Sequence, residues 1–429
     1  MTPMLKTIHP IASARGEFRI PGSKSMSHRA LIMAALAEGE SRICNALASQ
    51  DTLLTAEALR SLGVDIQWDG DTVRVEPAER RWRSPDAPIM LGNSGTSMRL
   101  LPAVAALGSG RFVFDGDPRL RERPVGPVVE GLRQLGVQCR YLSEAGFPPI
   151  EIVSAGIEGG AVTVDARRSS QFLSAVLLAA PQARCDLKVT WLKPVASYPY
   201  VALTLHMMAE AGIRIDRLDS DSVCIPAPQP YPALRYTVEG DCSSASYFWS
   251  AAAITGGEVF THPIGRESPQ GDRRFLDVLE AMGCRTAWLA DGVRVSGPAR
   301  LKPVDIDMNE MPDMVPTLAA VAAFAEGESR IRNVAHLRVK ESDRLKVTAI
   351  ELRKFQVPVE ELADGLVIGG GRVRPPQVPI ETHEDHRIAM TFAVMGLRTS
   401  GVVVAGAECV AKSFPNFWEV FDSLGETGS

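Results

Sequence analysis

A stripe of apolar residues followed by a glycine recurs along the chain and predicts a repeated structural unit. The phrase is roughly L-x-x-(L/A/M)-G-(V/I/C). Its spaced apolar residues are typical of the last turns of a helix, and its glycine is typical of a helix C-terminal cap. Successive copies lie 69 to 76 residues apart. The cap position falls at Gly63, Gly136, Gly212, Gly283 and, in weaker copies, at Gln356 and Gly425.

The segments that follow these caps predict pairs of short strands. Residues 65–75, 285–295 and 358–368 each read as a strand, a tight turn and a second strand. Residues 34–45 (AALAEGESRICN) and 322–333 (AAFAEGESRIRN) are nearly identical and predict an apolar helix, a glycine cap and a strand. Six units of this kind predict an α/β architecture built by repetition, arranged as two lobes of three units.

The proline-rich segment 226–233 lies near the middle of the chain and is interpreted as a boundary between the lobes. A cleft between two lobes is where a small-molecule site is expected.

The composition excludes several classes of protein. Of 429 residues, 45% are hydrophobic and 23% charged, and the net charge is −5 without a basic block, which disfavours nucleic acid as a partner. Apolar runs such as 100–108 and 315–325 are shorter than the roughly 18 residues that a membrane span needs. Residues 1–20 contain charges and prolines where a secretory signal would be apolar. We therefore expect a cytoplasmic protein with no membrane partner.

The seven cysteines are scattered, with no C-x-x-C spacing. That pattern disfavours a disulfide framework and a structural zinc site, so we expect reduced thiols that are mostly buried.

Polar residues open several apolar helices in the first half of the chain. In PGSKSMSHRA (21–30), Lys24 and Arg29 add positive charge to a helix N-terminus, which suits a phosphate or a carboxylate. A capped helix with solvated basic residues is the simpler alternative. The small residues of LGNSGTSMRLL (91–101) would let the backbone approach a ligand before a helix. The serines of RRSSQFLSAV (167–176) could bind phosphate or sugar-like oxygens. The arginines of DPRLRERPVGP (117–127) are interpreted as a solvated charge run.

The second half of the chain carries candidate acids, bases and further cations. Asp313 directly precedes a very apolar helix, so it is either a helix N-terminal charge or a general base. The charges of RVKESDRLK (338–346) could form salt bridges along a helix. His383 and His386 have a spacing that metal sites also use, but no H-E-x-x-H pattern or third ligand accompanies them.

The basic residues share one property, because nearly all of them stand at predicted helix starts or turns. Convergence on one cationic cleft is the economical explanation, and such a cleft suits a small substrate with several negative groups. Asp313 and Glu341 would then supply acid and base. The basic residues are Lys24, Arg29, Arg123, Lys340, Arg344, Arg387 and Lys412.

Eight motifs in this order resemble those of the 5-enolpyruvylshikimate-3-phosphate synthase family. They are PGSKSMSHRA, LGNSGTSMRL, RERP, SSQF, EGDCSSASYF, RVKESDR, DHRIAM and AKSFP. The resemblance covers nearly the whole chain. It implies a two-lobed, inside-out α/β barrel-like fold of six βαβαββ repeats. One lobe is 1–22 with 241–429, the other is 23–240, and the active site lies in the cleft between them.

The resemblance also implies an activity. Family members transfer the enolpyruvyl group of phosphoenolpyruvate to the 5-hydroxyl of shikimate 3-phosphate through a tetrahedral intermediate, and they release phosphate. This step belongs to the shikimate pathway to chorismate and the aromatic amino acids, and it is the target of glyphosate. No cofactor and no metal are implied, and a monomer is expected.

Roles for individual residues follow from the resemblance alone. Lys24, Asp313, Glu341 and His386 are implied as catalytic. Shikimate 3-phosphate is implied to meet Ser25, Arg29, Ser169, Ser170, Gln171, Ser197, Tyr200, Asp313, His336 and Lys340. Phosphoenolpyruvate is implied to meet Lys24, Gly95, Arg123, Gln171, Arg344, Arg387 and Lys412.

Two positions depart from the family pattern. His336 stands where an asparagine is usual, and a neutral imidazole replaces either the donor or the acceptor of an amide but not both. Leu100 stands where many members have proline.

Three alternatives remain open at this point. The first is an enolpyruvyl transferase acting on UDP-N-acetylglucosamine, which typically has a reactive cysteine in an arginine-bearing loop, whereas residues 116–126 contain none. The second is a non-catalytic anion-binding protein on the same fold, against which the retention of Asp313 and Glu341 argues. The third is a nucleic-acid-processing relative, which the net charge disfavours.

Overall fold

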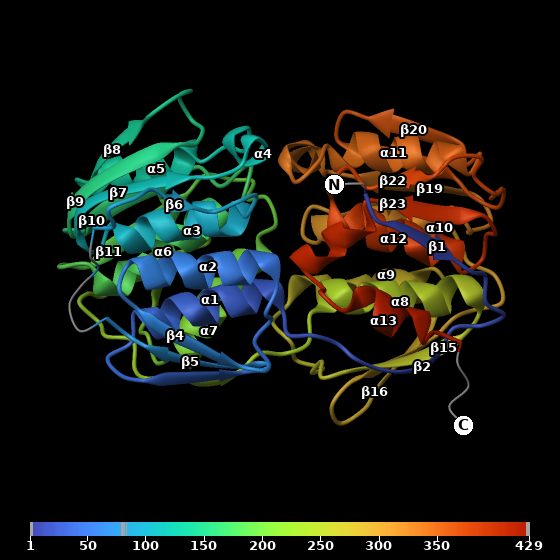
Figure 1. The fold of residues 1–429 in the computed structure, drawn as a ribbon, viewed down its shortest axis with the longest axis horizontal. Helices are drawn as coiled ribbons and strands as arrows, with labels where there is room; N and C mark the ends of the chain where they lie inside the picture. Colours follow the sequence, from blue (N-terminus) through green and yellow to red (C-terminus); the bar gives the residue numbers. More distant parts are fainter. Residues whose placement is uncertain (1–2, 79–81, 83, 426–429) are drawn as a thin grey trace. The chain divides into compact units, whose positions relative to one another are not determined.

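The computed structural model describes residues 3–78, 82 and 84–425, and the chain divides into two compact units (Figure 1). Unit 1 contains Met1–Ser23 and Glu239–Ser429, and unit 2 contains Lys24–Val238. Each unit has its own cluster of buried apolar side chains. The proline-rich segment 226–233 lies inside unit 2, so its interpretation as a boundary is wrong.

Unit 2 contains three four-stranded sheets with one shared plan. In each sheet an edge strand pairs in parallel with the second strand, which pairs antiparallel with one arm of a hairpin. The sheets are β14 (Arg235–Thr237), β3 (Ser41–Cys44), β5 (Thr72–Glu76), β4 (Asp65–Asp69); β6 (Ile89–Met90), β7 (Ser109–Asp115), β9 (Ile150–Ala155), β8 (Gln138–Tyr141); and β10 (Gly160–Val164), β11 (Leu187–Trp191), β13 (Ser222–Ile225), β12 (Asp216–Asp219).

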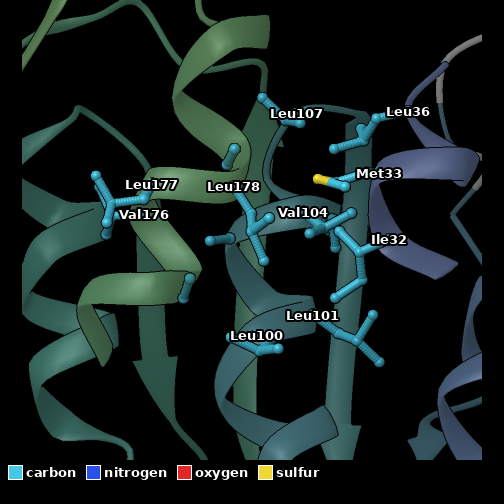
Figure 2. Packing of buried hydrophobic residues seen from close by; sticks show 14 of the residues in the cluster. Ile32, Met33, Leu36, Leu100, Leu101, Val104, Leu107, Val176, Leu177 and Leu178 are labelled. Atoms are coloured by element: carbon cyan, nitrogen blue, oxygen red, sulfur yellow. The ribbon is translucent and has the colours of Figure 1, made fainter. Parts of the chain in front are cut away.

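The helices of unit 2 form its core. Nearly every residue of α1, α3 and α6 is buried, and beyond their polar first turns the helices are mostly apolar. Figure 2 shows Met33 of α1, Val104 of α3 and Leu178 of α6 in this core. The helices are α1 (Lys24–Ala35), α2 (Gln50–Ser61), α3 (Gly95–Ala105), α4 (Pro118–Arg121), α5 (Gly126–Gln134), α6 (Gln171–Ala179), the 3-10 turn η1 (Ala180–Gln182) and α7 (Pro199–Glu210).

Unit 1 repeats this plan in two sheets and departs from it in the third. The third sheet has three strands, and the N-terminal strand takes the place of the hairpin arm that the other sheets form locally. The sheets are β16 (Arg285–Trp288), β17 (Val293–Ser296), β15 (Glu258–His262), β2 (Arg15–Arg19); β18 (Asp305–Asp307), β19 (Glu328–Arg332), β21 (Gly365–Gly369), β20 (Val359–Leu362); and β1 (Leu5–Ile8), β23 (Val402–Ala405), β22 (Ile380–Glu381).

Helices again occupy the interior of unit 1, where α8, α10 and α12 are almost wholly buried. The helices and 3-10 turns are α8 (Cys242–Thr255), η2 (Gly271–Arg274), α9 (Phe275–Ala281), η3 (Pro312–Met314), α10 (Val315–Ala322), η4 (Ala335–Val339), α11 (Arg344–Lys354), α12 (His386–Gly396), η5 (Ala407–Lys412) and α13 (Phe417–Asp422).

The structure confirms the repeat and its caps. All six cap positions have a positive φ, the left-handed conformation that ends a helix. Gln356 has a φ of +58°, so it adopts the glycine conformation at a position where glycine is absent. Residues 34–45 and 322–333 both run from a helix through a turn into a strand, as expected. The α/β prediction is therefore confirmed.

Two expectations about single features have different outcomes. No helix among the described residues is long and apolar enough to cross a membrane. The cysteines are all free thiols, but they are not mostly buried: Cys139, Cys242 and Cys284 are buried, whereas Cys185 is exposed and the others are intermediate. Cys44 and Cys224 end or lie on the inner strands β3 and β13, Cys185 lies in the bend after η1, and Cys409 lies in η5.

Candidate active site

The group of predicted residues in unit 2 begins at the N-terminus of α1. Lys24 is the first residue of this helix, and its Nζ lies 3.1 Å from Oδ2 of Asp51 in α2. The Asp51 side chain is almost fully buried, at 3% exposure, while that of Lys24 is 13% exposed. A buried carboxylate thus fixes the ammonium group at a helix start, where anions are favoured.

Arg29 lies one turn further along α1 and is buried. Its guanidinium donates to hydroxyls of Thr204 and Ser174 and to the backbone carbonyls of Ser25 and Tyr200, at 2.8 to 3.2 Å. These partners are neutral oxygens. Burial lowers the pKa of Arg29 to about 10, because charge is costly to keep away from water. A buried cation held in this way is well suited to bind an anionic or hydroxyl-rich ligand.

Gly95 and Arg123 are in direct contact. Gly95 begins α3, and a β-carbon placed on it would lie 2.4 Å from Cζ of Arg123. The Arg123 side chain also donates to the backbone carbonyl of Asn93 at 3.2 Å. Arg123 is buried, whereas Arg119 pairs with exposed Glu122 and the half-exposed Arg121 pairs with Asp115. The interpretation of a solvated charge run is therefore correct for those two and wrong for Arg123.

Gln171 joins the starts of two helices. Its amide nitrogen donates to Thr96 at 3.0 Å, and its amide oxygen accepts from Arg99 at 2.8 Å, so the first residue of α6 is tied to α3. Ser169 and Ser170 directly precede α6 and are buried. Ser169 Oγ accepts from the backbone N–H of Gln171. Hydroxyls, an amide and an arginine therefore meet at one end of the helix pair.

Ser197 and Tyr200 lie at the start of α7. Ser197 is buried and has a φ of +57°, a conformation that costs free energy for a residue with a side chain. The backbone N–H of Tyr200 donates to the carbonyl of Ser197 at 3.1 Å. Because the Tyr200 carbonyl also accepts from Arg29, this turn joins the α1 group.

Arg344 is the centre of the group in unit 1. Its guanidinium binds both carboxylate oxygens of Asp385, at 2.8 and 3.1 Å, and also contacts Asp313 at 2.9 Å and Glu341 at 2.8 Å. The Arg344 and Asp385 side chains are 2% and 0% exposed. Of the salt bridges expected within 338–346, the Glu341–Arg344 pair is present, but helix α11 begins only at Arg344.

Asp313 stands between two arginines. One of its oxygens accepts from Arg344 and the other from Arg387 at 2.8 Å. Burial would raise the pKa of Asp313, but the charges of Arg387, Lys340 and Arg344 outweigh burial and hold that pKa well below its usual range. In this arrangement the Asp313 carboxylate is a weak base, so its use as a base requires that the arginines find another anion.

His336 on η4 and Lys340 directly after η4 lie close to Asp313. Burial and the charge of Lys340 lower the pKa of His336 to about 3, against the opposing effect of Asp313. The imidazole is therefore neutral at physiological pH. It can act as one donor or one acceptor toward a ligand hydroxyl, in place of the amide that the family pattern has there.

This depressed pKa predicts a change in stability with pH. Between about pH 6.5 and 3 the unfolded chain binds a proton at His336 that the folded chain does not, so acidification favours unfolding. His336→Asn removes this contribution. The advantage of the wild type over the variant in free energy of unfolding should shrink as pH falls from 7 to 4.5, as measured by urea titration. A difference independent of pH would contradict the assignment. His206→Asn, on the surface of α7, is the control.

His386 and Lys412 complete the predicted set. His386 is buried at the start of α12, with Nδ1 3.8 Å from Oδ1 of Asp385. Lys412 ends η5, which packs on α12, and is also buried. Exposed His383 lies 3.6 Å from Glu351. Among the described residues, no three His, Cys, Asp or Glu side chains are grouped to hold a metal ion.

Three buried acids that were not predicted from the sequence hold these groups. Asp51 pairs with Lys24, and Asp385 pairs with Arg344 and caps α12. Asp272 accepts from the Ser243 hydroxyl at 2.5 Å, and burial together with Asp313 raises its pKa to about 6. Only Asp385 left a sequence signal, as an N-cap before the HRIAM helix. The pairings of Asp51 and Asp272 depend on tertiary contacts.

The predicted residues thus fall into two groups, one in each unit. Comparisons with known proteins show which family the chain belongs to. A profile of the family described as EPSP synthase (3-phosphoshikimate 1-carboxyvinyltransferase) matches residues 8–421. The chain belongs to the EPSP synthase family.

Individual relatives agree with the family match. A Syntrophobacter fumaroxidans protein named 3-phosphoshikimate 1-carboxyvinyltransferase is 58% identical over 421 residues, which are 98% of this chain and 100% of that one. A Vibrio vulnificus protein of the same name is 43% identical over 428 residues, covering 98% and 99%. The solved EPSP synthase of Acinetobacter baumannii superposes with a TM-score of 0.83 at 30% identity, covering 99% of both chains.

These relatives confirm the expected enolpyruvyl transferase fold. The enolpyruvyl transferase NikO of Streptomyces tendae, at 20% identity and a TM-score of 0.78, supports the fold alone. Among the alternatives left open by the sequence, EPSP synthase membership does not favour a UDP-amino-sugar transferase, a binding protein or a nucleic-acid-processing relative.

Proposed function

We propose that this chain is a 3-phosphoshikimate 1-carboxyvinyltransferase, which transfers the enolpyruvyl group of phosphoenolpyruvate to the 5-hydroxyl of shikimate 3-phosphate and releases phosphate. The EPSP synthase family and the names of its relatives support this activity. The observation that carries it is the position of Asp313 between Arg344 and Arg387. This arrangement puts the carboxylate that the reaction needs as a base beside two cations that can bind anionic groups of a substrate. The activity is a step of aromatic amino acid biosynthesis.

Shikimate 3-phosphate would bind mainly to the unit 2 group. Hydroxyls and a planar guanidinium at helix starts suit a phosphate and a ring with several hydroxyls. Arg29 is already oriented by neutral oxygens. The assigned residues are Ser25, Arg29, Ser169, Ser170, Gln171, Ser197 and Tyr200, with Asp313, His336 and Lys340 of unit 1.

Phosphoenolpyruvate would bind to cations of both groups. Its carboxylate and phosphate call for charge-assisted and partly bidentate contacts, which arginine provides best. Gly95 leaves the space that the Arg123 guanidinium fills. The assigned residues are Lys24, Gly95, Arg123, Gln171, Arg344, Arg387 and Lys412.

Binding of phosphoenolpyruvate would also activate the base. When a substrate anion takes up hydrogen bonds of Arg344 and Arg387, less positive charge is left on Asp313, and its pKa rises toward a useful value. Asp313 then accepts the proton of the 5-hydroxyl while that oxygen bonds to C2 of phosphoenolpyruvate. The adduct is tetrahedral at C2.

Proton transfer at the neighbouring carbon completes the reaction. Glu341 or Lys24 delivers a proton to the methylene carbon during addition. The group that delivered the proton then takes one back from the resulting methyl group, which re-forms the double bond as the C2–O bond to phosphate breaks and phosphate leaves. His386, next to Asp385, is assigned a supporting hydrogen bond. From the family resemblance we also propose that the protein works as a monomer, in the cytoplasm.

A phosphate-release assay tests the function. The purified protein should release phosphate from phosphoenolpyruvate only when shikimate 3-phosphate is present. UDP-N-acetylglucosamine and unphosphorylated shikimate are the competing acceptors. Release with the sugar nucleotide alone, or with no acceptor, would refute the proposal.

Gly95→Ala tests the assignment of Gly95 and Arg123. The added methyl must displace the Arg123 guanidinium, since the β-carbon would lie 2.4 Å from its Cζ. We expect the KM for phosphoenolpyruvate to rise about tenfold. The inhibition constant of glyphosate, which is slightly longer, should rise considerably more. Gly131→Ala, where the nearest atoms lie at 3.7 Å, is the control. Equal proportional changes in both constants would show that Gly95 does not line the inhibitor pocket.

A further inference from the structure

A continuous run of buried side-chain hydrogen bonds lies directly behind the unit 2 group. His28 Nδ1 is 2.8 Å from the hydroxyl of Thr55, which is 2.7 Å from that of Ser97, which is 2.7 Å from that of Ser94. All four residues are buried, with exposures of 1% or less. We call this set the hydroxyl run.

The hydroxyl run connects three helices at regular spacing. Lys24 and His28 are four residues apart on α1, and Asp51 and Thr55 are four residues apart on α2, so each pair lies on one helical face. The two helices are therefore joined twice, by Lys24–Asp51 and by His28–Thr55.

The third helix is joined where it begins. Ser94 is the N-cap of α3 and accepts from the backbone N–H of Ser97, and Gly95 is the next residue. The Ser97 hydroxyl lies between Thr55 and Ser94, and is also 3.5 Å from the backbone carbonyl of Asp51. The hydroxyl run thus ends at the cap that sets the position of Gly95 against Arg123.

We propose that Thr55 and Ser97 are positioning residues for phosphoenolpyruvate, acting through Lys24 and through the start of α3. This inference rests on the proposed function. Neither hydroxyl needs to touch the substrate. Each hydroxyl fixes the distance between two groups. One is the Lys24 ammonium on α1, and the other is Gly95 at the start of α3, where it contacts Arg123.

Proton counting explains why the middle members matter most. Each hydroxyl has one proton to donate and two lone pairs to accept with, so Thr55 and Ser97, which each contact two partners in the run, can donate to at most one of them. Removing the hydroxyl of Thr55 leaves His28 Nδ1 and the Ser97 hydroxyl without this partner in a water-free interior. The helices must then shift to find other partners.

Arg29 is held independently of the hydroxyl run. Its contacts are to Ser174 of α6, to Thr204 and Tyr200 of α7, and to Ser25 of its own helix. A shift of α2 and α3 against α1 therefore leaves the contacts of Arg29 intact, whereas Gln171, which is bonded to α3, is assigned to both substrates. The two substrates should respond differently.

The experiment compares Thr55→Val, Thr55→Ser and Ser97→Ala in the full chain. We expect Thr55→Val and Ser97→Ala to raise the KM for phosphoenolpyruvate about tenfold, since small displacements of a binding group cost large factors. The Kd of shikimate 3-phosphate alone, measured by calorimetry, should change less than twofold. Thr55→Ser restores the hydroxyl and should restore the wild-type KM.

Thr348→Val is the matched control. Thr348 is also a fully buried helical threonine, but its hydroxyl has no hydrogen-bond partner in the described structure. It should leave both constants unchanged. If Thr55→Val fails to fold, Ser97→Ala carries the test.

Two outcomes would overturn the inference. Equal changes in the constants of both substrates, or no change in either, would show that the hydroxyl run has only a structural role. If the wild type shows no turnover, the proposed function fails and the inference fails with it. Wild-type turnover without the predicted split refutes the inference alone.

Discussion

Asp313→Asn is expected to lower turnover by about 100-fold or more, while shikimate 3-phosphate still binds. The amide keeps the size and one accepting oxygen of the carboxylate, but it cannot take the proton of the attacking hydroxyl. It also removes the charge that holds Arg344 and Arg387 in place, each of which binds one oxygen of Asp313. Steady-state kinetics and a calorimetric titration of shikimate 3-phosphate measure the two effects.

Asp305→Asn is the control, because Asp305 is an exposed acid that pairs with Arg332 on the surface of the same unit. Its turnover should equal that of the wild type. Turnover of Asp313→Asn within a few-fold of the wild type would remove Asp313 from the base role. Glu341→Gln, tested alongside, should also lose about 100-fold if Glu341 transfers the proton at the methylene carbon.

Arg344→Ala is expected to lower the free energy of unfolding by about 3 to 5 kcal/mol, because it removes the arginine partner of the Asp385 carboxylate, which is 0% exposed. The melting temperature should fall by roughly 10 °C, a shift that follows from this free energy for a unit of this size. The Ser342 hydroxyl and the backbone N–H of Arg387 also donate to Asp385, but neutral donors compensate a buried charge only in part.

Arg332→Ala is the matched control for that loss. Arg332 makes a single ion pair with Asp305, and both side chains are about half exposed. Such a pair contributes roughly 0 to 1 kcal/mol. Urea titration and calorimetry of both variants decide the prediction. Equal losses would show that the buried arrangement around Arg344 has no special weight in stability.

The repeat was readable from the sequence because helix caps and hairpins are local. The cap positions need a positive φ, which favours glycine, and that requirement recurs in every repeat. Gln356 shows the limit of this logic, since it adopts the same conformation without being glycine. The third sheet of unit 1 was not predictable, because β1 comes from the other end of the chain.

The sequence indicated the cations of the site but not the acids that pair with them. Motifs placed Lys24 and Arg344 at helix starts, and a resemblance gave them roles. Which acid meets each cation depends on contacts between helices that are far apart in sequence, as in Lys24–Asp51. The spacing of Arg119, Arg121 and Arg123 does not reveal which of them is buried, although Arg123 was also placed in the predicted cleft.

The central claim is that the enolpyruvyl group moves to one particular oxygen. Incubation of the protein with [2-¹³C]phosphoenolpyruvate and shikimate 3-phosphate, followed by nuclear magnetic resonance, tests it directly. The account predicts a labelled vinyl carbon that shows a three-bond coupling to the ring proton at carbon 5, with one phosphate released per ether formed. A coupling to another ring proton, or phosphate release without a labelled ether, would contradict it.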